Sequence, residues 1–135
     1  MNKITRLVVA DDSFHARHGL CAILAAQPGM DIVGEASQGA EALTLIETQR
    51  PDVAVLDVHM PVMDGIQAAH TIKNRWPQVR VVLISMYADY QKEALEAGAD
   101  AFLVKGCPAE ELLSVVMGVK TAKNENGTNP TCKEF

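Results

Sequence analysis

Short apolar segments alternate with longer amphipathic segments along most of the chain. Five of the apolar segments are rich in β-branched residues, and most are continuous rather than alternating. They cover residues 7–10, 32–36, 53–56, 79–84 and 101–104. Strands that are buried on both faces of a parallel sheet have this pattern. The pattern therefore predicts five strands that pair in parallel.

Between these segments, apolar residues recur at spacings of three and four, which is the period of an amphipathic helix. Glycine, proline or an N-capping residue marks the expected ends of these helices. The five apolar stripes are Ala16, Leu20, Ile23 and Leu24; Ala40, Leu43 and Ile46; Ile66, Ala69 and Ile72; Ala94, Leu95 and Ala97; and Leu112, Val115, Val116 and Val119. The markers are Pro28, Gly29, Pro51, Asp64 as an N-cap, Pro77, Gly98, and Pro108 in a first helical turn.

The elements follow the order strand then helix, repeated five times. Because crossovers between parallel strands are right-handed, the helices are expected on both faces of one sheet. We therefore predict an α/β fold, a flavodoxin-like, doubly wound five-stranded parallel sheet, over residues 1–120. Residues 121–135 contain few apolar side chains and several Asn, Gly and Pro residues, so they predict a flexible C-terminal tail.

Composition narrows the possible functions. A length of 135 residues with 48% apolar and 21% charged residues is typical of one globular domain. A net charge of −5 argues against nucleic-acid binding by this chain, because phosphate backbones require a basic surface. The apolar stretch near the N-terminus is too short for a signal peptide, and no run reaches the roughly 20 residues of a membrane span.

The cysteines give information about the compartment. There are three, Cys21, Cys107 and Cys132, and they are widely spaced. An odd number at such spacings predicts neither a disulfide framework nor a zinc site. Free cysteines are typical of a reducing compartment, so we expect the protein in the cytoplasm.

Charged and hydroxyl side chains directly follow four of the five predicted strands. Asp11 and Asp12 follow the first strand, Asp57 the third, Ser85 the fourth and Lys105 the fifth. In an open parallel sheet, ligands bind beyond the carboxyl ends of the strands. We therefore expect these five side chains to converge at one edge of the sheet.

This set of residues suits phosphoryl transfer. Three close carboxylates repel one another, and a hard divalent cation such as Mg²⁺, which prefers oxygen ligands, relieves that repulsion. Lys105 can offset the remaining negative charge, and Ser85 can donate a hydrogen bond to a phosphoryl oxygen. Asp57 can then act as a nucleophile and form an acyl phosphate.

Four motifs in this order resemble the receiver domain of bacterial two-component response regulators, over about residues 4–120. The matching segments are VVADDS at 8–13, DVHMPVMDG at 57–65, LIS at 83–85 and GADAFLVK at 98–105. Segments 32–36 and 105–108 are similar to the subgroup that usually carries a helix-turn-helix DNA-binding output domain. The resemblance therefore implies phosphorelay signalling that controls an output such as transcription.

The resemblance also implies a metal site. Asp11 and Asp12 are similar to the acidic pair of the family, with Asp12 as the more direct ligand of Mg²⁺. Asp57 is similar to the phosphoacceptor, which also contacts the ion. The backbone carbonyl of His59 occupies the position of a further ligand.

The remaining roles concern the switch and its partners. By resemblance, Ser85 is the switch hydroxyl, Phe102 the switch aromatic and Lys105 the lysine of the family. The implied phosphoryl donor is a phosphohistidine on a sensor histidine kinase or a phosphotransfer protein. Such a domain catalyses its own phosphorylation and dephosphorylation and is not a turnover enzyme. Phosphorylation is expected to change its conformation, with homodimerisation as one outcome.

Three other functions fit parts of the sequence. Met86 after Ser85, and Gly106 where many receivers have proline after the lysine, favour an interaction module that is independent of phosphorylation. A phosphatase with an aspartate nucleophile typically has a second aspartate two residues later, where this chain has His59. A flavin-binding protein shares the fold, but Asp11 and Asp12 would repel a flavin phosphate.

Overall fold

The computed structural model describes residues 3–118, so the predicted tail at 121–135 and Cys132 lie outside the described residues. Five strands form one parallel sheet in the order β2-β1-β3-β4-β5. They are β1 (Thr5–Ala10), β2 (Met30–Ala36), β3 (Val53–Asp57), β4 (Arg80–Ser85) and β5 (Ala101–Val104). The five predicted strands are confirmed, with shifts of one or two residues at several of their ends.

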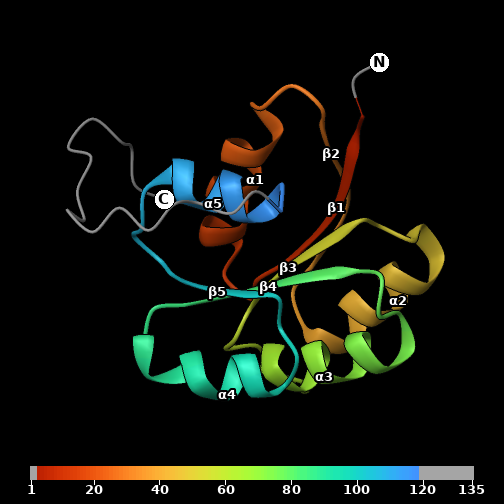
Figure 1. Ribbon diagram of the computed structural model, residues 1–135, viewed down its shortest axis with the longest axis vertical. Helices are drawn as coiled ribbons and strands as arrows, with labels where there is room; N and C mark the ends of the chain where they lie inside the picture. The colour runs from red at the N-terminus through yellow and green to blue at the C-terminus, as the bar shows by residue number, and fades with distance from the viewer. Residues whose placement is uncertain (1–2, 119–135) are drawn as a thin grey trace.

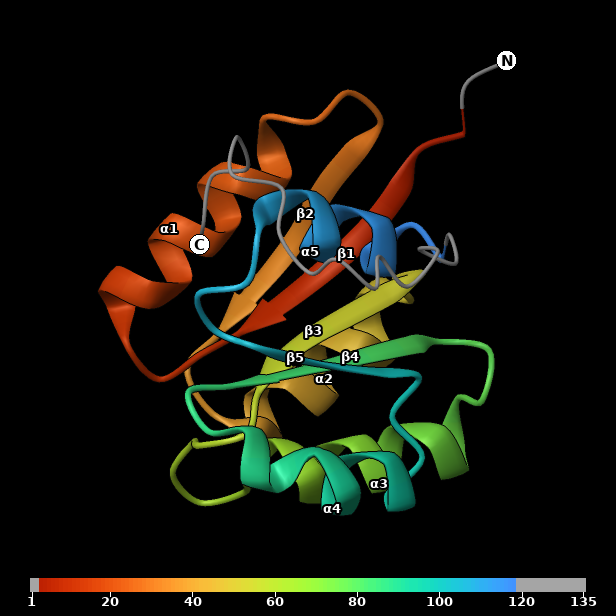
Figure 2. The same ribbon diagram turned by 60° about the vertical axis from the view of Figure 1, so that its left-hand side comes forward.

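Helices cover both faces of the sheet, as predicted. They are α1 (Phe14–Ala25), α2 (Gly39–Gln49), α3 (Gly65–Arg75), α4 (Gln91–Glu96) and α5 (Ala109–Val116), with a short 3-10 helix (Ala88–Tyr90) before α4. Figures 1 and 2 show α1 and α5 on one face and α2, α3 and α4 on the other. The doubly wound, flavodoxin-like fold class is therefore confirmed.

Two apolar layers fill the space between the sheet and these helices. In β3, Val53 and Val55 belong to the layer beneath α1 and α5, while Ala54 and Leu56 belong to the layer beneath α2, α3 and α4. All four side chains are buried. Because successive strand residues point to opposite faces, a sheet covered on both sides requires apolar residues at every position. This explains the continuous apolar runs in the sequence.

Capping side chains set where the helices begin. Asp64 forms a capping box with Gln67: the Gln67 N–H donates to Asp64 Oδ1 at 2.8 Å, and Gln67 Oε1 accepts from the Asp64 N–H at 3.0 Å. Ser13 caps α1 by accepting from the Ala16 N–H. Pro108 lies one position before the first residue of α5 rather than in its first turn.

The loop between β3 and α3 is packed closely against its neighbours. A Cβ on Gly65 would lie 2.2 Å from the carbonyl oxygen of Asp57, so only glycine fits there. Val62 has φ 69°, and the Met63 N–H donates to the Pro61 carbonyl at 2.7 Å, which makes a γ-turn centred on Val62. The residues after Asp57 therefore form a compact loop at the carboxyl edge of the sheet.

Candidate functional site

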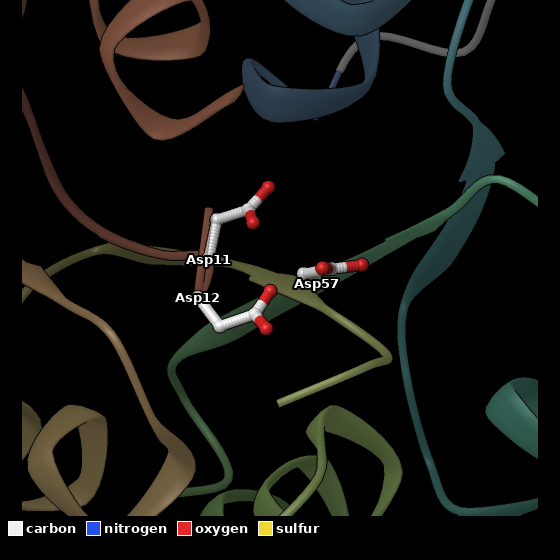
Figure 3. Close-up of side chains that lie close together, drawn as sticks. All are labelled: Asp11, Asp12 and Asp57. Atoms are coloured by element: carbon white, nitrogen blue, oxygen red, sulfur yellow. The ribbon is translucent and has the colours of Figure 1, made fainter. Parts of the chain in front are cut away.

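Three carboxylates meet where β1 and β3 end. One carboxylate oxygen from each of Asp11, Asp12 and Asp57 lies within 4.8 Å of the other two (Figure 3). Asp11 and Asp57 are buried, at 0% and 4% exposure, whereas Asp12 is exposed. The convergence expected from the strand ends is thus what the structure shows for these three residues.

Lys105 brings a positive charge to this cluster from the end of β5. Its Nζ atom lies 2.8 Å from Asp11 Oδ2 and 3.6 Å from Asp57 Oδ2. The lysine side chain is 17% exposed. One ammonium group therefore lies between two buried carboxylates, and the cluster retains an excess of negative charge.

This excess of charge changes the proton affinity of the buried groups. Burial and the nearby charge of Asp11 raise the pKa of Asp57 to about 6, although Lys105 and the backbone N–H of His59 oppose the shift. For Lys105, burial alone would lower the pKa, but the hydrogen bond to Asp11 and the attraction of Asp57 outweigh it and raise the pKa. Lys105 therefore stays charged at neutral pH, and the ionised form of Asp57 is destabilised.

The donor set fits a hard cation. Three carboxylates within reach of one position provide oxygen ligands, which Mg²⁺ prefers, and the cluster contains neither histidine nor cysteine. The raised pKa of Asp57 shows that its charge is poorly compensated by the protein alone. A divalent cation at this position would stabilise the ionised carboxylate.

Hydrogen bonds hold Asp11 on four sides. Its N–H donates to the Ala36 carbonyl at 3.0 Å, and its Oδ1 accepts from the Ser13 N–H at 2.9 Å. Its Oδ2 accepts from Lys105, and its carbonyl oxygen accepts from Arg17 Nη1 at 2.7 Å. Sequence patterns did not single out Arg17, because nothing local distinguishes it from an ordinary exposed helix residue.

The predicted switch residues lie on neighbouring strands. Ser85 is fully buried at the end of β4, and its Oγ accepts from the Tyr87 N–H at 3.0 Å. A hydroxyl that accepts in this way keeps its own O–H to donate. Phe102 pairs in register with Leu83, is half-buried, and packs against the layer beneath α2, α3 and α4.

His59 links the loop after β3 to the segment after β4. Its imidazole ring makes edge-to-face contacts with Tyr87, at 5.7 Å between centroids, and with Tyr90, at 4.8 Å. Its backbone N–H acts on the Asp57 carboxylate and lowers the pKa of that group. These contacts fix the main chain of His59 beside the acidic cluster.

A cavity of about 330 Å³ lies beside the cluster. Asp11 and Lys105 line it together with Ile84 and residues of α1, and Gly19 leaves part of it open because no atom lies within 4 Å of a Cβ placed there.

His15 and His18 are exposed on α1. The sequence interpretation that they occupy an exposed helix face is confirmed.

The two cysteines among residues 3–118, Cys21 and Cys107, are partly buried free thiols. Burial raises the pKa of the Cys21 thiol to about 11 and that of the Cys107 thiol to about 12. Both thiols therefore stay protonated at neutral pH, a form of low reactivity. Within residues 3–118, no helix is long and apolar enough to cross a membrane.

Comparisons with known proteins identify the family. Residues 7–117 match the family described as the response regulator receiver domain. The chain is 39% identical over 110 residues to the transcriptional regulatory protein YhcZ of Bacillus subtilis (strain 168), covering 80% of this chain and 51% of YhcZ. The solved receiver domain of NarL from Mycobacterium tuberculosis has a TM-score of 0.81 and 38% identity, covering 86% of this chain and 95% of that one.

A further similar structure contains Mg²⁺ and BeF3. One chain of the solved CheX-CheY-BeF3-Mg complex from Borrelia burgdorferi has a TM-score of 0.77 and 30% identity to this chain, covering 84% of this chain and 87% of that one. The chain spans about half the length of the curated relatives it matches. The motifs, the sheet order and these matches agree: this chain belongs to the response regulator receiver domain family of two-component signalling.

Proposed function

We propose that Asp57 accepts a phosphoryl group from a phosphohistidine on a sensor histidine kinase or phosphotransfer protein. The observation that carries the proposal is the placement of Asp57: it is buried, within 4.8 Å of two other carboxylates, and 3.6 Å from the Lys105 ammonium. A nucleophile whose charge is poorly compensated, beside a fixed cation, suits phosphoryl transfer, in which the protein mainly positions groups and stabilises charge.

In the proposed reaction, a carboxylate oxygen of Asp57 attacks phosphorus while the bond between phosphorus and the donor imidazole nitrogen breaks. The imidazole leaves neutral after taking up a proton, and an acyl phosphate remains on Asp57. Lys105 and the Ser85 hydroxyl then contact phosphoryl oxygens. Attack by water on phosphorus returns free Asp57 and inorganic phosphate, so the chain catalyses its own modification and is not a turnover enzyme.

Mg²⁺ is the proposed cofactor. Asp11, Asp12, Asp57 and the backbone carbonyl of His59 would hold it, with Asp12 as the most accessible carboxylate. When bound, the ion supplies positive charge against the carboxylates and the phosphoryl oxygens. The presence of BeF3 and Mg²⁺ in the CheY complex supports this ligand chemistry, because a fluoroberyllate has the tetrahedral shape of a phosphoryl group.

The conformational response is also proposed. Ser85 would turn toward the phosphoryl group, and Phe102, now half-buried on β5, would pack further inward. Partners would detect the changed face, with homodimerisation as one outcome. The names of the relatives support an output in transcription regulation. The proposed compartment is the cytoplasm, where free cysteines stay reduced. With a net charge of −5, this chain itself would not bind nucleic acid.

Mass spectrometry of the intact protein tests this proposal. Incubated with Mg²⁺ and acetyl phosphate, the wild-type chain should gain one phosphoryl group, and Asp57→Asn should gain none. Asp100→Asn is the matched control, because it removes a carboxylate at the opposite edge of the sheet and should be labelled like the wild type. An unlabelled wild-type chain, under conditions that label another receiver domain, contradicts the proposal.

A phosphorylation-independent interaction module is the second candidate. Met86 and Tyr87 are 63% and 59% exposed directly after Ser85, which leaves an apolar surface free for a partner. Partner binding that Asp57→Asn does not change, together with an unlabelled wild-type chain, would favour this candidate.

A further inference from the structure

Arg17 on α1 connects three parts of the molecule near the acidic cluster. Its Nη1 donates to the carbonyl oxygen of Asp11 at 2.7 Å, and its Nε donates to Glu35 Oε1 on β2 at 3.1 Å. The guanidinium carbon lies 5.6 Å from the centroid of the Phe14 ring. The arginine side chain is only 16% exposed. The guanidinium is therefore fixed on several sides, which a freely solvated arginine is not.

The carbonyl that Arg17 holds belongs to the peptide bond between Asp11 and Asp12. Asp11 has other attachments, through its N–H and both carboxylate oxygens. The Asp12 side chain takes part in no hydrogen bond or ion pair among residues 3–118, and it is exposed. The main chain therefore sets where Cβ of Asp12 lies, and with it the positions that the Asp12 carboxylate can reach.

We propose that Arg17 is a positioning residue of the Mg²⁺ site: it fixes the Asp11–Asp12 peptide and thereby holds the Asp12 carboxylate toward Asp11 and Asp57. The inference rests on the proposed function, since it assumes that this cluster holds Mg²⁺. Groups that orient metal ligands from outside the coordination sphere commonly change metal affinity by about 10–100-fold when they are removed.

The direction in which Arg17→Ala changes the affinity for Mg²⁺ distinguishes a positioning role from a purely electrostatic one. Arg17 is a cation, and a cation near the cluster repels Mg²⁺. If charge were its only influence, Arg17→Ala would strengthen Mg²⁺ binding, and Arg17→Lys would leave it unchanged. If Arg17 positions Asp12, Arg17→Ala weakens binding although a repelling charge has been removed.

Titration calorimetry of the full chain with Mg²⁺, and separately with Mn²⁺, makes the test. We expect Arg17→Ala to weaken binding of both ions by about tenfold. Arg17→Lys keeps the charge and a hydrogen-bond donor group, the ammonium, but loses the planar guanidinium that reaches two acceptors at once. Its affinity for Mg²⁺ should therefore lie between those of the wild type and Arg17→Ala. Should Arg17→Ala fail to fold, the comparison of Arg17→Lys with the wild type makes the same test, because charge alone predicts no difference.

Arg75→Ala is the matched control. Arg75 also pairs with a glutamate, Glu47, at 3.1 Å and also lies over an aromatic ring, Trp76, at 4.4 Å, but it is at the end of α3 away from the cluster. Its loss should leave the affinity for Mg²⁺ unchanged. If Arg17→Ala and Arg17→Lys bind Mg²⁺ as tightly as the wild type, or more tightly, the positioning role of Arg17 is wrong. That result would leave the proposed metal site itself unaffected. A wild-type chain that binds no Mg²⁺ contradicts the proposed metal site itself.

Discussion

A lysine–aspartate pair lies at each end of the strands, one at the amino edge, where the strands begin, and one at the carboxyl edge, where they end. The two pairs differ in how many charges they bring together. At the amino edge, Lys73 Nζ donates to the carbonyls of Pro77 and Val79 and to Asp100 Oδ2, at 3.0, 2.9 and 2.9 Å. Asp100 Oδ2 also accepts from the Val81 N–H at 2.8 Å. All three ammonium donors are used, and one cation meets one anion. This pair connects α3, β4 and β5 and leaves no charge uncompensated.

At the carboxyl edge, a single lysine meets several carboxylates. Lys105 bonds Asp11 at 2.8 Å and lies 3.6 Å from Asp57, while Asp12 adds a third negative charge. The cost of this excess is seen in the pKa of Asp57, which burial and Asp11 raise to about 6. The same residue types thus form a closed structural link at one edge, and a site that still requires positive charge at the other.

Replacing each lysine separately with methionine should give the largest difference between the two edges, in labelling rate and in stability. Lys105→Met should slow phosphoryl labelling of Asp57 at least about a hundredfold, because the transferred charge loses its fixed cation. Lys73→Met should be labelled within about twofold of the wild-type rate, but should lower the free energy of unfolding by about 2 kcal/mol through lost charge-assisted hydrogen bonds. Labelling rates come from intact mass, and stability from urea denaturation. If the two variants lose similar amounts of labelling rate and of free energy of unfolding, the carboxyl edge is not the reactive site and the amino edge is not a purely structural link.

Neutralising one aspartate at each edge should change stability in opposite directions. The pKa of Asp57 is raised from 3.8 to about 6, so between these values the folded protein binds more protons than the unfolded chain. Stability from this group is therefore greatest below pH 4 and is lost as pH rises through 6. Without Mg²⁺ at pH 7.5, Asp57→Asn should raise the free energy of unfolding by about 2 kcal/mol, and by little at pH 4.

Asp100→Asn is the counterpart at the amino edge. It weakens the bonds to Lys73 and to the Val81 N–H, so it should lower the free energy of unfolding by about 1 kcal/mol at pH 7.5. Denaturation curves of both variants at the two pH values measure the contrast. If Asp100→Asn raises the free energy of unfolding, or Asp57→Asn lowers it at pH 7.5, the two edges do not differ in how their negative charge is compensated. Either result contradicts the proposed contrast.

The smallest expected change in the free energy of unfolding comes from replacing one residue with positive φ near each edge. Val62, at φ 69°, is β-branched and 86% exposed in the loop after β3. Val62→Gly should raise the free energy of unfolding by about 0.5 kcal/mol, because relief of the left-handed conformation exceeds the entropy cost of glycine. Arg50, at φ 49°, ends α2, and its Nε donates to the Glu47 carbonyl. Arg50→Gly loses that bond and should change stability little; thermal denaturation of both variants makes the comparison.

The carboxyl edge was largely predictable from local patterns, and the amino edge was not. Asp11, Asp12 and Asp57 each follow an apolar run, and parallel strands bring their ends together. Lys73 and Asp100 have no such signal, because one lies within a helix and the other in a turn before a strand. Gly106 is an intermediate case: its φ of 98° explains why glycine and not proline follows Lys105, but only the structure shows that conformation. The predicted roles of Ser85 and Phe102 stay predictions.

The sequence by itself determined the order of strands and helices and which side chains end each strand, because apolar periodicity and capping residues act over a few neighbouring positions. Only the tertiary structure decided how the charges are shared. The bond between Lys105 and Asp11 joins residues 94 positions apart, and the pKa of Asp57 depends on how deeply the packed helices bury it. Burial and the distances between charges are properties of the packed molecule, so local patterns cannot give them.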